Sequence, residues 1–158
     1  LLEHVQYDDA PFIYELLNSP GWIEHIGDRG IKSMVHAEEY IRHSLRKSYQ
    51  ENGWGLDKMI LKETGQAIGL CGLVNRPSLP QPDLGFALLP EFEGKGLAFE
   101  ASQCVLRFAQ KDLGLPAVLA ITSEENHRSQ RLLERLGMKF QGKKELGGVA
   151  SSVMLYQV

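Results

Sequence analysis

The chain has 158 residues, of which 43% are apolar and 23% charged, a composition that predicts one globular domain over residues 1–158. The formal net charge is -3 and no long run of Lys or Arg occurs, which argues against a protein that works on nucleic acid. No apolar run approaches the roughly 20 residues needed to span a bilayer, and the first residues lack the features of a signal peptide. We therefore expect a cytoplasmic protein without a membrane partner, although the chain begins at Leu1 and a preceding segment remains open.

The first half of the chain predicts two helices. Asp8 can cap a helix that runs to about Asn18, with Pro11 in its first turn, where a missing N–H costs little. The cluster Asn18-Ser19-Pro20-Gly21 ends this helix, and residues 27–30 are predicted as a loop. Ser33 or His36 begins the second helix, which stops near Asn52-Gly53.

Three strands are predicted next. Residues 54–61 and 67–74 are strand-like runs around Lys62 to Gln66, which has the composition of a hairpin turn. Residues 76–82 contain three prolines and are predicted as a loop. The following residues, 84–89, alternate between two faces and form the third strand of this sheet.

A long amphipathic helix follows the glycines at positions 94 and 96, and a further strand follows the helix. Gly114 and Pro116 end the helix, and residues 117–121 are typical of a strand buried on both faces. Strand, helix and strand together predict a parallel pair with a right-handed crossover, whose ligands bind where the first strand turns into the helix. Two more strands are expected at residues 139–146 and 149–158. The apolar face of the helix is predicted to consist of Leu97, Ala101, Cys104, Val105, Phe108 and Ala109.

The two cysteines, Cys71 and Cys104, both lie among apolar residues and are expected to be reduced residues of the core. The histidines share no metal-ligand spacing with them, so no metal cofactor is expected.

The turn between the third strand and the long helix has the features of an anion site. The first N–H groups of a helix lack intrahelical partners and carry partial positive charge, and Gly94 and Gly96 allow positive φ and close approach of a ligand. Taken alone, Gly94-Lys95-Gly96 is equally consistent with a plain turn. A Walker A loop is excluded because Leu97 follows Gly96, and a dinucleotide fingerprint is excluded because Phe99 occupies the place of its third glycine.

Combined with residues 126–138, Asn-His-Arg-Ser-Gln-Arg-Leu-Leu-Glu-Arg-Leu-Gly-Met, this turn resembles the GNAT superfamily of acyl-CoA-dependent N-acetyltransferases. Within it, the chain is similar to the branch of ribosomal-protein N-terminal acetyltransferases. The resemblance implies an α+β (mixed α/β) fold, in which about four helices flank a twisted, mostly antiparallel sheet with one splayed parallel strand pair. It also implies acetyl-CoA as co-substrate and an amine as acceptor.

The same resemblance implies the cofactor site. The turn wraps the pyrophosphate of coenzyme A with backbone N–H groups, the Leu88 N–H faces the thioester carbonyl, and Asn126 and Ser129 line the pantetheine channel. The implied cofactor-binding residues are Leu88, Leu89, Phe92, Gly94, Lys95, Gly96, Leu97, Ala98, Asn126 and Ser129.

Two residues depart from the family pattern. Glu93 stands where Arg, Gln or an aromatic residue is common, and we expect its carboxylate to turn to solvent, away from the phosphates. Leu133 stands where many relatives carry a tyrosine that protonates the departing thiolate. An alkyl thiol with a pKa of ~8.5 is already a tolerable leaving group, and Ser129 or a water can donate a hydrogen bond instead.

The expected reaction is direct attack of a primary amine on the thioester in a ternary complex. The Leu88 N–H would stabilise the developing oxyanion, and Asp83 is the candidate base, with a solvated loop carboxylate as its alternative. The acceptor stays open between a peptide amino terminus, a polyamine, an amino sugar antibiotic and an amino acid. The first two helices, residues 21–31, residues 76–82 and the last strands are expected to select it. A monomer or homodimer is expected, and a silent acyl-CoA sensor or interaction module is the rival function.

Overall fold

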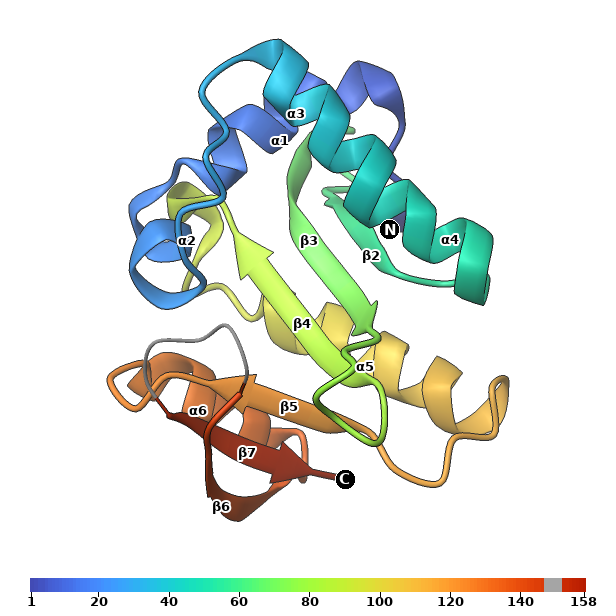
Figure 1. Ribbon diagram of the computed structural model, residues 1–158, viewed down its shortest axis with the longest axis vertical. Coiled ribbons are helices and arrows are strands. Elements are labelled where there is room, and N and C mark those ends of the chain that lie inside the picture. The colour runs from blue at the N-terminus through green and yellow to red at the C-terminus, as the bar shows by residue number, and fades with distance from the viewer. Residues whose placement is uncertain (147–151) are drawn as a thin grey trace.

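The computed structural model describes residues 1–146 and 152–158, whose strands form one sheet in the order β1-β2-β3-β4-β5-β7-β6 (Figure 1). Neighbouring strands are antiparallel except β4 and β5, which are parallel. The expected α+β fold with a mostly antiparallel sheet and one parallel pair is therefore confirmed. The strands are β1 (Leu2–Glu3), β2 (Leu56–Ile60), β3 (Ala67–Val74), β4 (Asp83–Leu88), β5 (Leu119–Thr122), β6 (Lys139–Lys144) and β7 (Val153–Gln157).

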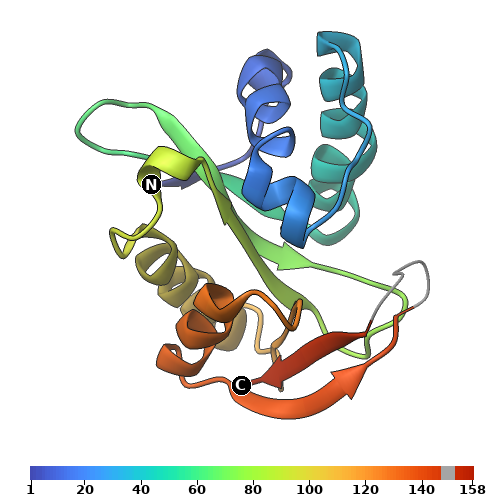
Figure 2. The same ribbon diagram turned by 90° about the vertical axis from the view of Figure 1, so that its left-hand side faces the viewer.

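Helices cover both faces of this sheet (Figure 2). One apolar cluster joins the helices of the first half to Leu70 of β3 and to Leu89 just after β4, and a second joins α5 and α6 to the opposite face of the sheet. The helices are α1 (Ala10–Leu17), α2 (Pro20–His25), α3 (Met34–Tyr40), α4 (Lys47–Asn52), α5 (Leu97–Lys111) and α6 (His127–Arg135); the π-helical stretch η2 (Ile41–Arg46) joins α3 to α4, and η1 (Tyr7–Asp9) and η3 (Pro90–Phe92) are 3-10 turns.

The predicted helices of the first half are present, with one addition. Asp8 does not cap the first of them as predicted, because it lies within η1 and the N-cap of α1 is Asp9. Ser33 caps α3, because its Oγ accepts a hydrogen bond from the His36 N–H at 3.1 Å. The cluster expected only to end α1 also begins α2, which has Pro20 in its first turn. Proline suits this place because its fixed φ fits a helix start and its missing N–H would be unpaired there anyway.

The buried face of α5 is rotated relative to the prediction. Ser102 is fully buried, and its Oγ lies 3.7 Å from the Sγ of Cys71. Cys104 is exposed and Phe108 is 39% exposed, so the expectation that Cys104 is a core residue is wrong, whereas Cys71 is buried as expected. The helix packs along a stripe of smaller residues, which lets it approach the sheet closely. The buried residues of α5 are Ala98, Ser102, Val105, Leu106 and Ala109.

The parallel pair opens toward its carboxyl ends. Strands β4 and β5 are in register only at Asp83 and Leu119, and Figure 1 shows them diverging beyond that point. The predicted strand at 117–121 begins two residues later than expected, and of the predicted strand at 149–158, residues 149–151 lie outside the described residues. That residues 1–158 form a single domain stays a prediction.

Candidate active site

The turn that joins β4 to α5 has the backbone conformation of an anion cradle. Gly94 has φ of 74° and Gly96 has φ of 79°, values that side-chain-bearing residues rarely adopt. Gly96 is the N-cap of α5 and has no side chain with which to cap it. The first N–H groups of a long helix are therefore left for a ligand, at the end of the helix where its dipole favours negative charge.

The Leu88 N–H points into the opening between β4 and β5. The N–H of the next residue, Leu89, donates to the carbonyl of Ile68 at 2.8 Å, on the β3 side. Successive N–H groups along a strand point to opposite sides, so that of Leu88 points toward β5. Since β5 has already diverged, this donor is available to a carbonyl oxygen lying between the two strands.

The start of α6 faces the same opening. Asn126 is the N-cap of α6, and its Oδ1 accepts a hydrogen bond from the Ser129 N–H at 3.2 Å. The two residues implied to line the pantetheine channel are thus joined to each other. Leu133, one turn further along α6, is 1% exposed and belongs to the core cluster beneath α5, so its side chain contributes packing and no proton.

An ion pair stands beside the cradle. The Arg128 Nη1 donates to the Glu93 Oε2 at 2.8 Å. Glu93 was expected to turn to solvent. Its side chain is instead paired with Arg128 of α6, which neutralises its charge. The same guanidinium lies close to the turn, because a Cβ added at Gly94 would lie 3.2 Å from the Arg128 Nη2. Lys95 extends over the Phe92 ring, with its Nζ 5.6 Å from the ring centroid.

Asp83 is a buried carboxylate, and the alternative of a solvated loop carboxylate is wrong. Its side chain is 1% exposed, and the Arg76 Nε lies 3.0 Å and 3.2 Å from its two oxygens. Burial raises the pKa of Asp83 to about 6, and the positive charge of Arg76 opposes this shift. Asp83 precedes Leu88 by five residues, roughly 16 Å along a strand, so it does not touch a group bound at the Leu88 N–H.

Arg76 is a site residue that the sequence did not reveal. It begins the proline-containing loop between β3 and β4, where nothing in the local pattern distinguishes it from a solvated arginine. One feature of the sequence could have indicated the contact between Arg76 and Asp83. A short loop between two antiparallel strands can bring its first residue close to the start of the second strand.

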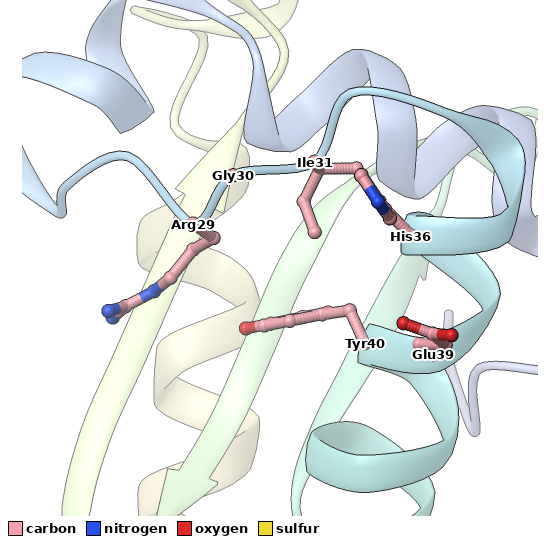
Figure 3. Close-up of a pocket in the computed structure, with 6 residues that line it drawn as sticks. All are labelled: Arg29, Gly30, Ile31, His36, Glu39 and Tyr40. Atoms are coloured by element: carbon pink, nitrogen blue, oxygen red, sulfur yellow. The ribbon is translucent and has the colours of Figure 1, made fainter.

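A cavity of about 260 Å³ lies between α3 and the loop before it (Figure 3). In Figure 3 the side chains of Arg29 and Tyr40 extend toward the same side, whereas His36 and Glu39 lie along α3. Burial raises the pKa of Tyr40, and the positive charges of Arg29 and Arg76 oppose this. The residues that line the cavity are Arg29, Gly30, Ile31, His36, Glu39 and Tyr40.

Comparison with known families identifies this arrangement. Residues 1–139 match the model of the acetyltransferase (GNAT) domain. The chain belongs to the GNAT family of acetyltransferases. The predicted enzyme class is confirmed, and with it the coarse chemistry of the family, acetyl transfer from acetyl-CoA.

Curated relatives and solved structures agree with this assignment. The chain is 23% identical over 142 residues to the uncharacterized N-acetyltransferase YnaD of Bacillus subtilis, covering 90% of this chain and 80% of the relative. It is 33% identical over 79 residues to the [ribosomal protein uS5]-alanine N-acetyltransferase of Escherichia coli, covering 49% of this chain and 41% of that enzyme. These matches confirm the resemblance to the ribosomal-protein branch.

A structure of RimL, the ribosomal L7/L12 α-N-protein acetyltransferase in complex with coenzyme A, has the same fold. It superimposes with a TM-score of 0.83 at 13% identity, covering 99% of this chain and 92% of RimL. Within residues 1–146 and 152–158, no helix is long and apolar enough to cross a membrane, and no group of three or more His, Cys, Asp or Glu side chains could hold a metal ion.

Proposed function

We propose that this GNAT protein transfers the acetyl group of acetyl-CoA to a primary amine by direct attack in a ternary complex. The observation that carries the proposal is the junction of β4 and α5, where two left-handed glycines precede a free helix start and the preceding strand diverges from its parallel neighbour. This junction offers donors to a pyrophosphate at the turn and to a carbonyl between the strands.

The residues of the turn would hold the cofactor mainly through the backbone. The N–H groups from Gly94 to Ala98 are directed at the phosphates, with Lys95 beside them, while Leu89 and Phe92 pack where the strand ends. Asn126 and Ser129 flank the opening from α6. When bound, acetyl-CoA supplies an activated acyl group in the form of a thioester.

The Leu88 N–H supports the chemical step. As the amine attacks, negative charge develops on the thioester oxygen, and a backbone donor already aimed at that place needs no rearrangement. The loss of such a donor elsewhere lowers rates on the order of 10²- to 10³-fold. Ser129, or a water beside it, is our candidate to donate to the departing thiolate, because Leu133 is buried in the core and has no proton to give.

We assign Asp83 the role of final acceptor of the amine proton, which would have to reach it over a chain of several waters, because roughly 16 Å of strand separates it from the Leu88 N–H. With a pKa of about 6, its carboxylate is ionised at neutral pH and yet basic enough to take a proton. The distance along β4 excludes direct contact with an amine at the Leu88 N–H. Arg76 is a positioning residue, because it holds both oxygens of Asp83 through one Nε.

The acceptor would enter over the cavity beside Arg29 and Tyr40. This cavity is built from Arg29 to Ile31 of the loop before α3 and from His36, Glu39 and Tyr40 of α3. Part of the loop at residues 21–31 and the second predicted helix, both expected from the sequence to select the acceptor, thus line this cavity. A cytoplasmic location, and a monomer or homodimer as the working form, stay predictions.

A test of the function is thiol release from acetyl-CoA with a panel of amines, with the acetylated product identified by mass spectrometry. The panel contains a peptide with a free amino terminus, its amino-terminally blocked twin, a polyamine, an amino sugar and a free amino acid. The proposal predicts rapid turnover with at least one unblocked amine and none with the blocked peptide. Tight binding of coenzyme A without turnover of any amine would instead identify a silent acyl-CoA sensor.

A further inference from the structure

A second cavity, of about 280 Å³, lies on the α5 side of the sheet. Its wall combines Leu2 of β1, Trp54 just before β2 and Phe108 of α5 with the carboxylate of Asp57 and the thiol of Cys104. These residues of α5 follow Leu97 by seven to eleven positions, roughly 10 to 16 Å along the helix. The cavity shares no residue with the cofactor turn or with the cavity beside Arg29.

The walls of this cavity consist largely of apolar side chains that remain partly exposed to solvent. Phe108 is 39% exposed, and it lies outside the buried stripe of α5, which consists of smaller residues. Trp54 and Leu2 are only partly buried against the core. An aromatic or aliphatic body entering the cavity would cover this surface, which is favourable at roughly 25 cal/mol per Å² removed from water.

Asp57 places one charge in this apolar wall. Its Oδ1 is buried and has no hydrogen-bond partner among the described residues, and the imidazole Nε2 of His4 lies 3.8 Å away. The neighbouring Lys58 is by contrast paired with Asp9 at 2.8 Å. The Asp57 side chain is 26% exposed although its Oδ1 is shielded, so a ligand in the cavity would reach the carboxylate through Oδ2.

A poorly satisfied carboxylate favours a cationic ligand. Burial raises the pKa of Asp57, and His4 and the Tyr49 hydroxyl oppose this shift only in part. His4 is itself stacked on Tyr49, with ring centroids 3.8 Å apart, which holds it in place. A hydrogen-bonding cation beside the carboxylate would offset the cost of its burial, and the faces of Trp54 and Phe108 attract cations as well.

We propose that this cavity binds a small ammonium compound with an aromatic or aliphatic body, whose N–H donates to the Asp57 carboxylate while its body covers Trp54 and Phe108. The site is separate from the acceptor site of the transfer reaction. Its ligand class follows from one under-satisfied carboxylate in an apolar wall.

The test uses Cys104 as a reporter of occupancy. Alkylation of Cys104 by iodoacetamide is followed by mass spectrometry, with the fully buried Cys71 as the internal reference. The probe is N,N-dimethyl-2-phenylethylamine, a tertiary amine that carries one N–H when protonated and cannot form a stable amide product. We expect saturating probe to slow Cys104 alkylation at least fivefold, and 2-phenylethanol, its neutral analogue, to bind at least tenfold more weakly.

Two variants complete the test. Asp57→Asn should abolish protection by the amine, whereas Glu63→Gln, in the exposed β2–β3 turn, should preserve it. Equal protection by the amine and the alcohol in the natural protein would overturn the proposal without recourse to any variant. So would the absence of protection, or full protection in a folded Asp57→Asn protein.

Discussion

Two carboxylates of the site, Asp83 and Glu93, are each held by an arginine, but with different exposure and consequences. Asp83 is almost fully buried, so its pairing with Arg76 only partly offsets the effect of burial on its pKa. Glu93 and Arg128 are 37% and 63% exposed, so water screens their pairing. The first pair sets the pKa of a buried carboxyl group, and the second sets the local charge beside the Gly94–Gly96 turn.

The raised pKa of Asp83 predicts a pH effect on the reaction. A base must be ionised to accept a proton, so the rate should fall as pH drops through about 6, after correction for the fraction of free amine. Asp83→Asn should lower kcat by tenfold or more, leave the affinity for coenzyme A unchanged and remove this acid limb. A variant with the natural pH profile would exclude Asp83 as the base.

The Glu93–Arg128 pair predicts non-additive effects on coenzyme A binding. Arg128→Ala leaves the Glu93 carboxylate uncompensated near the phosphates, so affinity should fall about tenfold by calorimetry. Glu93→Gln should raise affinity, because it releases Arg128, and the double variant should recover most of the loss. Equal losses in Arg128→Ala and the double variant would show that the arginine does not act through Glu93.

The helix α6 depends on a single side-chain cap. Asn126→Ala removes the acceptor of the Ser129 N–H and should lower the free energy of unfolding by about 1 kcal/mol in urea titrations. Asn126→Asp keeps a capping oxygen and should retain most of the stability. An Asn126→Ala variant as stable as the natural protein would mean that water replaces the cap without cost.

Most elements followed from local sequence because their signals are local. The proline in the first turn of α1, the left-handed Gly53 after α4 and the glycine turn before α5 each act through neighbouring residues. The α5 stripe was misplaced because Cys104 and Phe108 are apolar in type but border the second cavity. Choosing between two apolar faces requires the shape of the sheet, which the helix sequence does not contain.

The residues of the candidate site likewise fall into those that local sequence predicts and those that only the fold brings together. The cofactor turn was predicted from residues that are adjacent in the chain. Arg76 with Asp83, and Arg128 with Glu93, are partners across 7 and 35 positions and were paired only by the fold. The positions of the β7 strand between β5 and β6, and of β1 beside β2, likewise depend on contacts between distant segments.

Across the molecule, the cofactor would bind where several parts of the fold meet. The end of β4, the start of α5 and the start of α6 all border the opening. A ligand that binds only the folded state stabilises it, by about 2.7 kcal/mol at 100 times its Kd. Coenzyme A at that concentration should raise Tm by about 5 to 10 °C, and the absence of a shift in calorimetric scans would argue against a preformed site.

The central claim is that the turn from Gly94 to Ala98 holds the pyrophosphate of coenzyme A. The decisive measurement is a calorimetric titration of coenzyme A into Gly96→Val and into a matched control, Gly65→Val. Gly96 and Gly65 have φ of 79° and 72°, and an added Cβ meets nothing within 4 Å at either position, so both variants carry a similar backbone strain. We predict that Gly65→Val binds like the natural protein and that Gly96→Val loses at least 100-fold in affinity while remaining folded. Equal affinity in the two variants would contradict the assignment.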